Sequence, residues 1–118
     1  MFDDSKVSYE IEVYPEDIPI EGNVMASGDD DYDRQVEESI RANLESGNDW
    51  AWCMVRVIAR YEGIDCVEGT DHLGCCSYKS EDDFTQPGGY WEDMKDVARA
   101  ALYAELESIA HVLDNDTP

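Results

Sequence analysis

The sequence predicts a single α+β domain, arranged as a two-layer sandwich with the element order β-α-β-β-α. Three observations lead to this prediction. An alternating apolar segment opens the chain, a segment near the middle is apolar on both faces, and a long segment with helical periodicity closes it. We expect an antiparallel-leaning sheet of three or four strands, with two helices packed on one face.

The first predicted strand covers residues 7–14. Its apolar residues alternate with polar ones, which is typical of a strand with one buried face: Val7, Tyr9, Ile11 and Val13. Pro15 ends this strand. Residues 15–31 show little periodicity and contain two prolines and two glycines. They predict a long loop, and long loops are often functional.

The first helix is predicted to begin at the aspartates of residues 29–33, because carboxylates are favourable at a helix N-terminus. An apolar stripe with a spacing of four residues follows: Tyr32, Val36, Ile40 and Leu44. Residues 46–48 (Ser-Gly-Asn) end the helix.

The strongest predicted strand covers residues 50–61. Both of its faces are largely apolar, so it is expected to be a central strand, with Trp50 and Trp52 under a helix. Glu62 and Gly63 predict a turn, and a further strand is expected over residues 71–78, whereas residues 64–70 fit either a strand or a loop. Chain breaks are expected at residues 80–83 and 86–89.

The last predicted helix covers residues 90–113, on an apolar stripe of period 3.6 that runs from Trp91 to Leu113. Residues 1–6 and 114–118 are expected to be frayed ends. No internal repeat or linker interrupts the chain, so residues 1–118 are interpreted as one acidic domain.

The charge of the chain is extreme. The 118 residues hold 29 Asp and Glu against 8 Lys and Arg, a formal net charge of −21. Apolar residues make up 42% and aromatic residues 10%, too much for a disordered acidic tail. This charge argues against direct binding to nucleic acid or to an anionic membrane, because both require positive surface. A halophilic surface, or a generic acidic domain without mimicry, remains an alternative explanation.

The charge density can be compared with that of DNA. A globular chain of this mass exposes roughly 6,500 Å², or about 300 Å² per net charge. Duplex DNA carries a charge per roughly 100 Å². Carboxylates gathered on a third of the surface would therefore match the charge density of a duplex.

The sequence contains no apolar run of transmembrane length and no signal peptide at its start, which predicts a cytoplasmic protein with reduced thiols.

Metal and catalytic motifs are weak in this sequence. The spacing of Cys66, His72 and Cys75 departs from the usual zinc pattern, so we expect free, packed thiols and neither metal nor cofactor. A calcium loop starting at Asp29 would place Arg34 and Ile40 at its sixth and twelfth positions, where glycine and a carboxylate are required. No nucleophile or phosphate-binding motif is present, which predicts a protein that is not an enzyme.

The runs NDWAWCMVRVIARYEG and GTDHLGCCSYKSEDDF, with PEDIPIEGN upstream and GGYWEDM downstream, resemble a group of small acidic proteins encoded by tailed phages and prophages. The resemblance covers about residues 9–105. It implies a phage context rather than a reaction. As a class, small acidic phage proteins resemble DNA-mimic inhibitors, namely anti-CRISPR and anti-restriction proteins. That class likeness lies in charge, and it assigns no role to any residue.

The sequence therefore predicts an inhibitor of a host nucleic-acid-binding defence complex. Its carboxylates would occupy a basic DNA-binding surface in place of phosphates. Two acidic clusters are the candidate contacts: Asp29, Asp30, Asp31, Asp33, Glu37 and Glu38 (cluster one), and Glu81, Asp82, Asp83, Glu92, Asp93 and Asp96 (cluster two). The alternative is a protein-protein interaction module that binds through apolar loop residues: Ile18, Ile20, Val24 and Met25.

Overall fold

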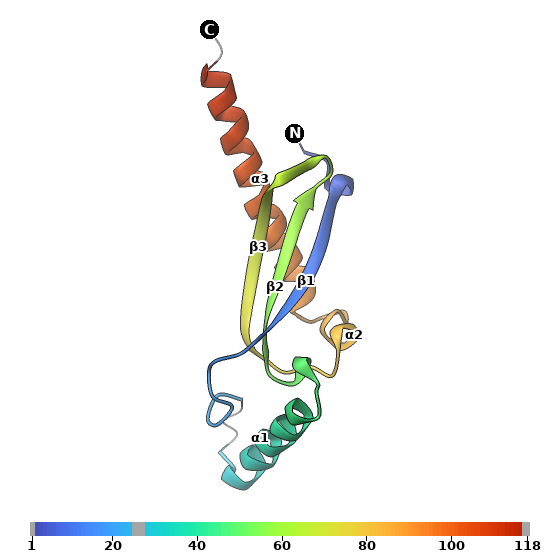
Figure 1. Ribbon diagram of the computed structural model, residues 1–118, viewed down its shortest axis with the longest axis vertical. Helices are drawn as coiled ribbons and strands as arrows, with labels where there is room; N and C mark the ends of the chain where they lie inside the picture. The colour runs from blue at the N-terminus through green and yellow to red at the C-terminus, as the bar shows by residue number, and fades with distance from the viewer. Residues whose placement is uncertain (1, 25–27, 117–118) are drawn as a thin grey trace.

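The computed structural model describes residues 2–24 and 28–116, with side chains described up to Ala110. It confirms the α+β class, with one antiparallel three-stranded sheet in the order β1-β2-β3 (Figure 1). The elements in chain order are the 3-10 turn η1 (Asp4–Lys6), β1 (Val7–Pro15), α1 (Asp30–Glu45), the 3-10 turn η2 (Asp49–Ala51), β2 (Cys53–Tyr61), β3 (Ile64–Cys76), α2 (Glu81–Phe84) and α3 (Tyr90–Asp116).

Strand β2 is central, as its two apolar faces predict, but it begins at Cys53 and not at Trp50, because residues 49–51 form the turn η2. Its alternate residues Cys53, Val55, Val57 and Ala59 are fully buried and form the middle of the core. β3 begins directly after the turn at Glu62 and Gly63, so the segment that fitted either a strand or a loop is strand. Gly63 has a φ of +80°, the left-handed conformation that such a tight turn requires.

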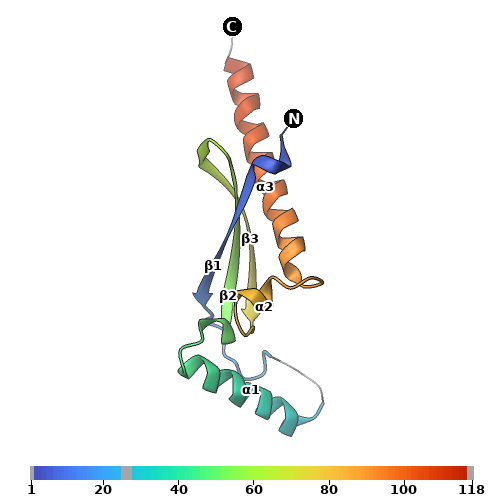
Figure 2. The same cartoon turned by 90° about the vertical axis from the view of Figure 1, so that its right-hand side faces the viewer.

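Helix α3 covers one face of the sheet and packs on β2 and β3. Its buried residues follow the predicted stripe: Met94, Ala98, Leu102 and Leu106. Gly69 of β3 is the point of closest approach, because a Cβ atom there would lie 2.0 Å from the carbonyl oxygen of Ala98. The helix continues to Asp116, so the expectation of fraying is wrong for residues 114–116, and residues 117–118 lie outside the described part. Its final turns project beyond the sheet (Figures 1 and 2).

Helix α1 is displaced from its predicted place. It was expected on the same face as the last helix, but it lies beyond one end of the sheet, next to η2 (Figure 2). The physical reason is that α3 and α2 already cover the inner face of the sheet. The turn η2 directs Trp52 away from that core, and the indole instead packs against Ile20 and Ile40. Trp50 remains with the main core, half-buried against Phe84 at a ring separation of 5.5 Å.

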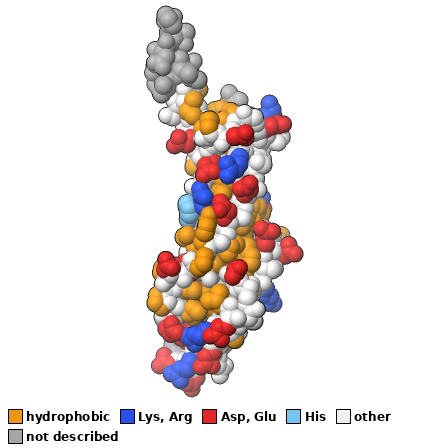
Figure 3. All heavy atoms as spheres, in the orientation of Figure 1, with side chains coloured by type: hydrophobic (Ala, Val, Ile, Leu, Met, Phe, Trp, Pro, Cys, Tyr) orange, Lys and Arg blue, Asp and Glu red, His pale blue; other side chains and the backbone are white. Residues whose placement is uncertain are grey.

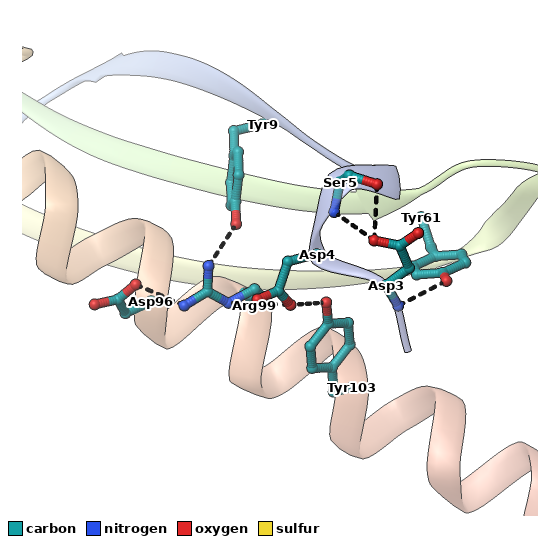
Figure 4. Close-up of polar contacts among 8 residues, drawn as sticks. All are labelled: Asp3, Asp4, Ser5, Tyr9, Tyr61, Asp96, Arg99 and Tyr103. Atoms are coloured by element: carbon teal, nitrogen blue, oxygen red, sulfur yellow. Dashed lines mark hydrogen bonds and ion pairs between the residues drawn. The ribbon is translucent and has the colours of Figure 1, made fainter. Parts of the chain in front are cut away.

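The N-terminal residues are packed rather than frayed, which corrects the prediction for residues 2–6. The Phe2 ring stacks on Tyr103 of α3 at 5.0 Å. The backbone N–H of Asp3 donates to the Tyr61 hydroxyl oxygen at 3.1 Å, and the Asp3 carboxylate caps η1 by accepting from Ser5 N–H (Figure 4). Aromatic side chains from β2 and α3 therefore hold the start of the chain.

The molecule is elongated. Its Cα atoms extend over 69 × 24 × 22 Å, and its accessible surface is 7778 Å². This surface exceeds the roughly 6,500 Å² of a globular chain of the same mass, because α1 and the end of α3 extend the structure at opposite ends (Figure 1).

Candidate acidic interface

Cluster one lies on the first half of α1 and is fixed by local hydrogen bonds. The Asp29 carboxylate caps the helix by accepting from the N–H groups of Asp31 at 3.1 Å and Tyr32 at 3.2 Å. Glu37, one turn further on, is half-buried and accepts from the N–H of Gly22 at 3.1 Å. Asp30, Asp31 and Glu38 are exposed and Asp33 is half-buried. The cluster is thus a set of carboxylates on a regular, capped helix.

Cluster two lies on α2 and on the first two turns of α3. The chain break expected at residues 80–83 is instead the short helix α2. The Ser80 hydroxyl oxygen caps it by accepting from Asp83 N–H at 3.3 Å, and the Asp83 carboxylate accepts from Lys79 N–H at 3.0 Å. Glu81 and Asp82 are exposed on this helix, as is Asp93 on α3. The last two members form ion pairs along α3: Glu92 with Lys95 at 3.1 Å and Asp96 with Arg99 at 2.8 Å.

The two clusters are not brought together. The start of α1 lies at one extreme of the long axis, whereas α2 and the start of α3 lie beside the sheet (Figures 1 and 2). Acidic side chains are spread along the described part of the face drawn in Figure 3, with basic side chains between them. The structure therefore presents two separate acidic regions on one long body.

An ion-pair ladder covers the sheet face opposite α3. Arg56 lies 3.2 Å from Glu12 and 2.7 Å from Glu68. Arg60 lies 3.1 Å from Glu68 and 3.6 Å from Glu10. Ile58, between the two arginines on this strand face, is fully buried without a helix above it. The signal that could have revealed the ladder is the register, which places Glu10 and Glu12 beside arginines on the neighbouring strand.

A second polar network joins the N-terminus to α3 (Figure 4). Arg99 donates to Asp96 and lies 3.5 Å from the Tyr9 hydroxyl oxygen and 4.0 Å from the Asp4 carboxylate. Asp4 also accepts a hydrogen bond from the Tyr103 hydroxyl. Desolvation, followed by this bond to Asp4, raises the pKa of Tyr103 to about 12. Asp96 is therefore part of a structural network, which makes it the weakest candidate contact of cluster two.

The cysteines are free thiols. Cys53 and Cys76 are buried cross-strand partners of β2 and β3. Desolvation, with a smaller effect from the neighbouring thiol, raises the pKa of Cys53 to about 12. Desolvation likewise raises the pKa of Cys76 to about 11. Among the residues that the structure describes, no three His, Cys, Asp or Glu side chains are grouped to hold a metal ion.

The apolar loop of the alternative prediction is only partly available for binding. Ile18 is 45% exposed, whereas Ile20 is buried against Trp52 and Val24 is half-buried beside them. The Trp52 indole N–H donates to the backbone oxygen of Ile18 at 2.7 Å, which ties the loop to the start of β2. Met25, the fourth predicted contact, lies outside the described residues. Most of the loop's described apolar surface therefore stabilises the fold.

Comparisons with known proteins give no relative: the chain matches no family model, and no curated protein or solved structure shows significant similarity to it. Within the described residues, no helix combines the length and the apolar character needed to cross a bilayer.

Proposed function

We propose that the protein is a phage-encoded, non-enzymatic inhibitor of a host nucleic-acid-binding defence complex, of the anti-CRISPR or anti-restriction kind, acting in the host cytoplasm. It would act as an acidic DNA mimic that occupies a surface lined by Lys and Arg. The observation that carries this proposal is the combination of a net charge of −21 with an elongated body whose Cα cross-section is 24 × 22 Å. A DNA-binding channel admits an elongated body that carries closely spaced negative charge.

The charge density supports competition with DNA at the acidic regions rather than over the whole surface. Dividing 7778 Å² by 21 net charges gives about 370 Å² per charge, against roughly 100 Å² on a duplex. Six of the cations, Arg34, Arg41, Arg56, Arg60, Lys95 and Arg99, are within ion-pairing distance of carboxylates. Four of these six lie on β2 or α3 and two lie on α1, whereas α2 carries Glu81, Asp82 and Asp83 with no Lys or Arg of its own.

Preorganisation is the second physical argument. Cluster one starts a capped 16-residue helix, and cluster two spans a capped helix and the start of α3. Carboxylates held on helices lose little backbone freedom when a basic surface binds them, whereas a flexible acidic tail would have to be ordered at that moment. Rigid acidic regions therefore give more affinity per charge than an acidic tail.

The experiment compares charge-neutralised proteins as inhibitors of DNA binding. One variant carries Asp29→Asn, Asp30→Asn, Asp31→Asn and Asp33→Asn. Another carries Glu81→Gln, Asp82→Asn, Asp83→Asn, Glu92→Gln and Asp93→Asn. Asparagine caps helices about as well as aspartate, so the fold is expected to persist. We expect at least one variant to lose most inhibition in a mobility-shift assay against a panel of CRISPR effector and restriction complexes.

A matched control removes four exposed charges outside both clusters, through Glu62→Gln, Asp65→Asn, Glu105→Gln and Glu107→Gln. This control should inhibit like the wild type. Wild-type inhibition should fade as the salt concentration approaches about 0.5 M, where screening becomes short-ranged. Full inhibition by both cluster variants would contradict mimicry and favour the apolar-loop interaction module, whose main exposed contact is Ile18.

A further inference from the structure

Strand β1 is an edge strand whose inner face is incompletely covered. α3 packs on β2 and β3, and β1 lies on the other side of β2. The inner residues of β2 are fully buried, whereas those of β1 are only half-buried although they pack on the same core: Val7, Tyr9, Ile11 and Val13. The hydrophobic core therefore continues to this edge and is left partly open there.

Cations of this acidic chain gather around β1. On the outer face, Arg60 and Arg56 pair with Glu10 and Glu12 of the strand. On the inner face, the Lys95 ammonium lies 5.8 Å from the centre of the Tyr9 ring, and Arg99 lies 3.5 Å from its hydroxyl oxygen. Lys6 immediately precedes the strand, so five of the chain's eight Lys and Arg flank β1. The negative charge along this edge is therefore partly compensated, because each carboxylate on β1 has a paired arginine, although Arg56 and Arg60 are both shared with Glu68.

We propose that the free edge of β1 is the interface with a second copy of this chain. The two β1 strands would pair antiparallel about a two-fold axis, giving a six-stranded sheet with both α3 helices on the same face. With the axis at Ile11, Tyr9 of one copy faces Val13 of the other, and the apolar inner row becomes continuous. Glu10 faces Glu12 across the axis, and each has an arginine of its own copy within ion-pairing distance, at 3.6 Å for Arg60 and 3.2 Å for Arg56, although both arginines also pair with Glu68. This proposal is independent of the proposed inhibitory function.

The charge of the chain and the regular pairing of β1 favour the β1 edge as the contact and a second copy as its partner. Two copies with 21 net negative charges each repel one another wherever uncompensated carboxylates meet, and a two-fold interface must be self-complementary. On the β1 edge each carboxylate of the strand has a paired arginine, and the register of β1 with β2 runs without a shift. The opposite edge, β3, is irregular at both ends of its pairing with β2 and carries Asp65 and Asp71. Such irregular, charged edges resist pairing.

The test uses matched lysine substitutions on the two edge strands. Ile11→Lys and Leu73→Lys each replace a half-buried apolar residue whose side chain lies on the inner face. At about 100 µM, above the dissociation constant of a standard-size interface, sedimentation equilibrium should give the wild type twice the 13.4 kDa of one chain. Leu73→Lys should remain dimeric, whereas Ile11→Lys should be monomeric, with dimerisation weakened at least tenfold. Raising the salt concentration should strengthen wild-type dimerisation, the opposite of its effect on binding to a basic target.

A second measurement needs no variant. Amide hydrogen exchange of the wild type, compared at low and high protein concentration, should show added protection confined to residues 7–15. A monomeric wild type at the higher concentration would overturn the proposal. Added protection in β3, or a monomer with Leu73→Lys and a dimer with Ile11→Lys, would also overturn it. If Ile11→Lys proves unfolded, the exchange measurement alone decides.

Discussion

The two parts of this molecule are held together by cores of very different size. We call the sheet with α2 and α3 the body, and α1 with residues 18–24 the lobe; the turn η2 links the two. In the described structure, the body core contains 11 buried residues, whereas the cluster that joins the lobe to the body contains three: Ile20, Ile40 and Trp52. The two acidic clusters therefore lie on parts of unequal stability, because cluster one is on the lobe and cluster two on the body.

The contrast follows from how much apolar surface each part can bury. α3 buries four residues at steps of four on the inner face of the sheet, whereas α1 buries one, Ile40. Burial of each large aliphatic side chain contributes about 1.5–3 kcal/mol. The lobe therefore depends on a few contacts, supplemented by polar ones such as the Glu37 bond to Gly22. We expect the lobe to open before the body unfolds.

The largest effect is expected at the contact between α3 and β3. Gly69→Ala places a Cβ atom 2.0 Å from the Ala98 carbonyl oxygen and 2.3 Å from the Leu102 nitrogen. Both are backbone atoms, so the helix must shift. We expect the free energy of unfolding to fall by about 3 kcal/mol or more. Thermal and urea denaturation measure it.

Gly74→Ala on the same strand is the matched control. Its added Cβ meets only the carboxylate of Glu16, at 3.0 Å, so a side chain and not the backbone must give, at no more than the cost of the Glu16 bonds to Cys75 and Ile18. We expect a loss below about 1 kcal/mol for this variant. Equal losses of unfolding free energy for the two variants would show that α3 does not pack closely against Gly69.

An intermediate effect, confined to the lobe, is expected for Ile40→Ala. Removing this buried side chain leaves a cavity beside Ile20 and Trp52 and should cost about 2 kcal/mol. Amide hydrogen exchange should show faster exchange in α1 and residues 18–24, with unchanged protection in β2 and α3. Uniformly faster exchange over the whole chain would contradict the division into body and lobe, because it would mean that the two parts unfold together.

The smallest effect is expected at the junction between the two parts, where Glu16 follows β1. Its carboxylate accepts from Cys75 N–H at 2.8 Å and from Ile18 N–H at 3.2 Å. These bonds, that to Cys75 first, lower the pKa of Glu16 below its ordinary value. The stabilisation is therefore fully present above the ordinary pKa of glutamate and is lost as the pH falls through the lower pKa of the folded state.

Glu16→Gln removes the charge at this junction and should cost about 1 kcal/mol at neutral pH. The difference in unfolding free energy between the variant and the wild type should shrink as the pH falls through the acidic range. Urea denaturation across that range measures it. A difference that stays constant with pH would mean that the Glu16 charge does not hold the junction.

Local patterns of the sequence determined most of the secondary structure. Alternation from Val7 to Val13 predicted β1, and the 3.6-residue stripe predicted α3. Apolar residues on both faces of residues 50–61 predicted a central strand, which is β2 over Cys53–Tyr61. The aspartates at residues 29–33 marked the start of α1, which begins at Asp30. These patterns succeed because burial of one face fixes the period of the side chains along the chain.

Only the tertiary structure decided where α1 lies, how the cations are placed and how far apart the two acidic clusters are. The sequence showed an apolar stripe on α1 but not its partner, and the partner is Trp52, which η2 directs away from the main core. In the sequence, Arg56 and Arg60 share a largely apolar strand face with no visible partner, and only the register shows that they form an ion-pair ladder with β1 and β3. Composition fixes net charge, whereas the distance between charges depends on contacts between residues far apart in the chain, and no local pattern encodes those contacts.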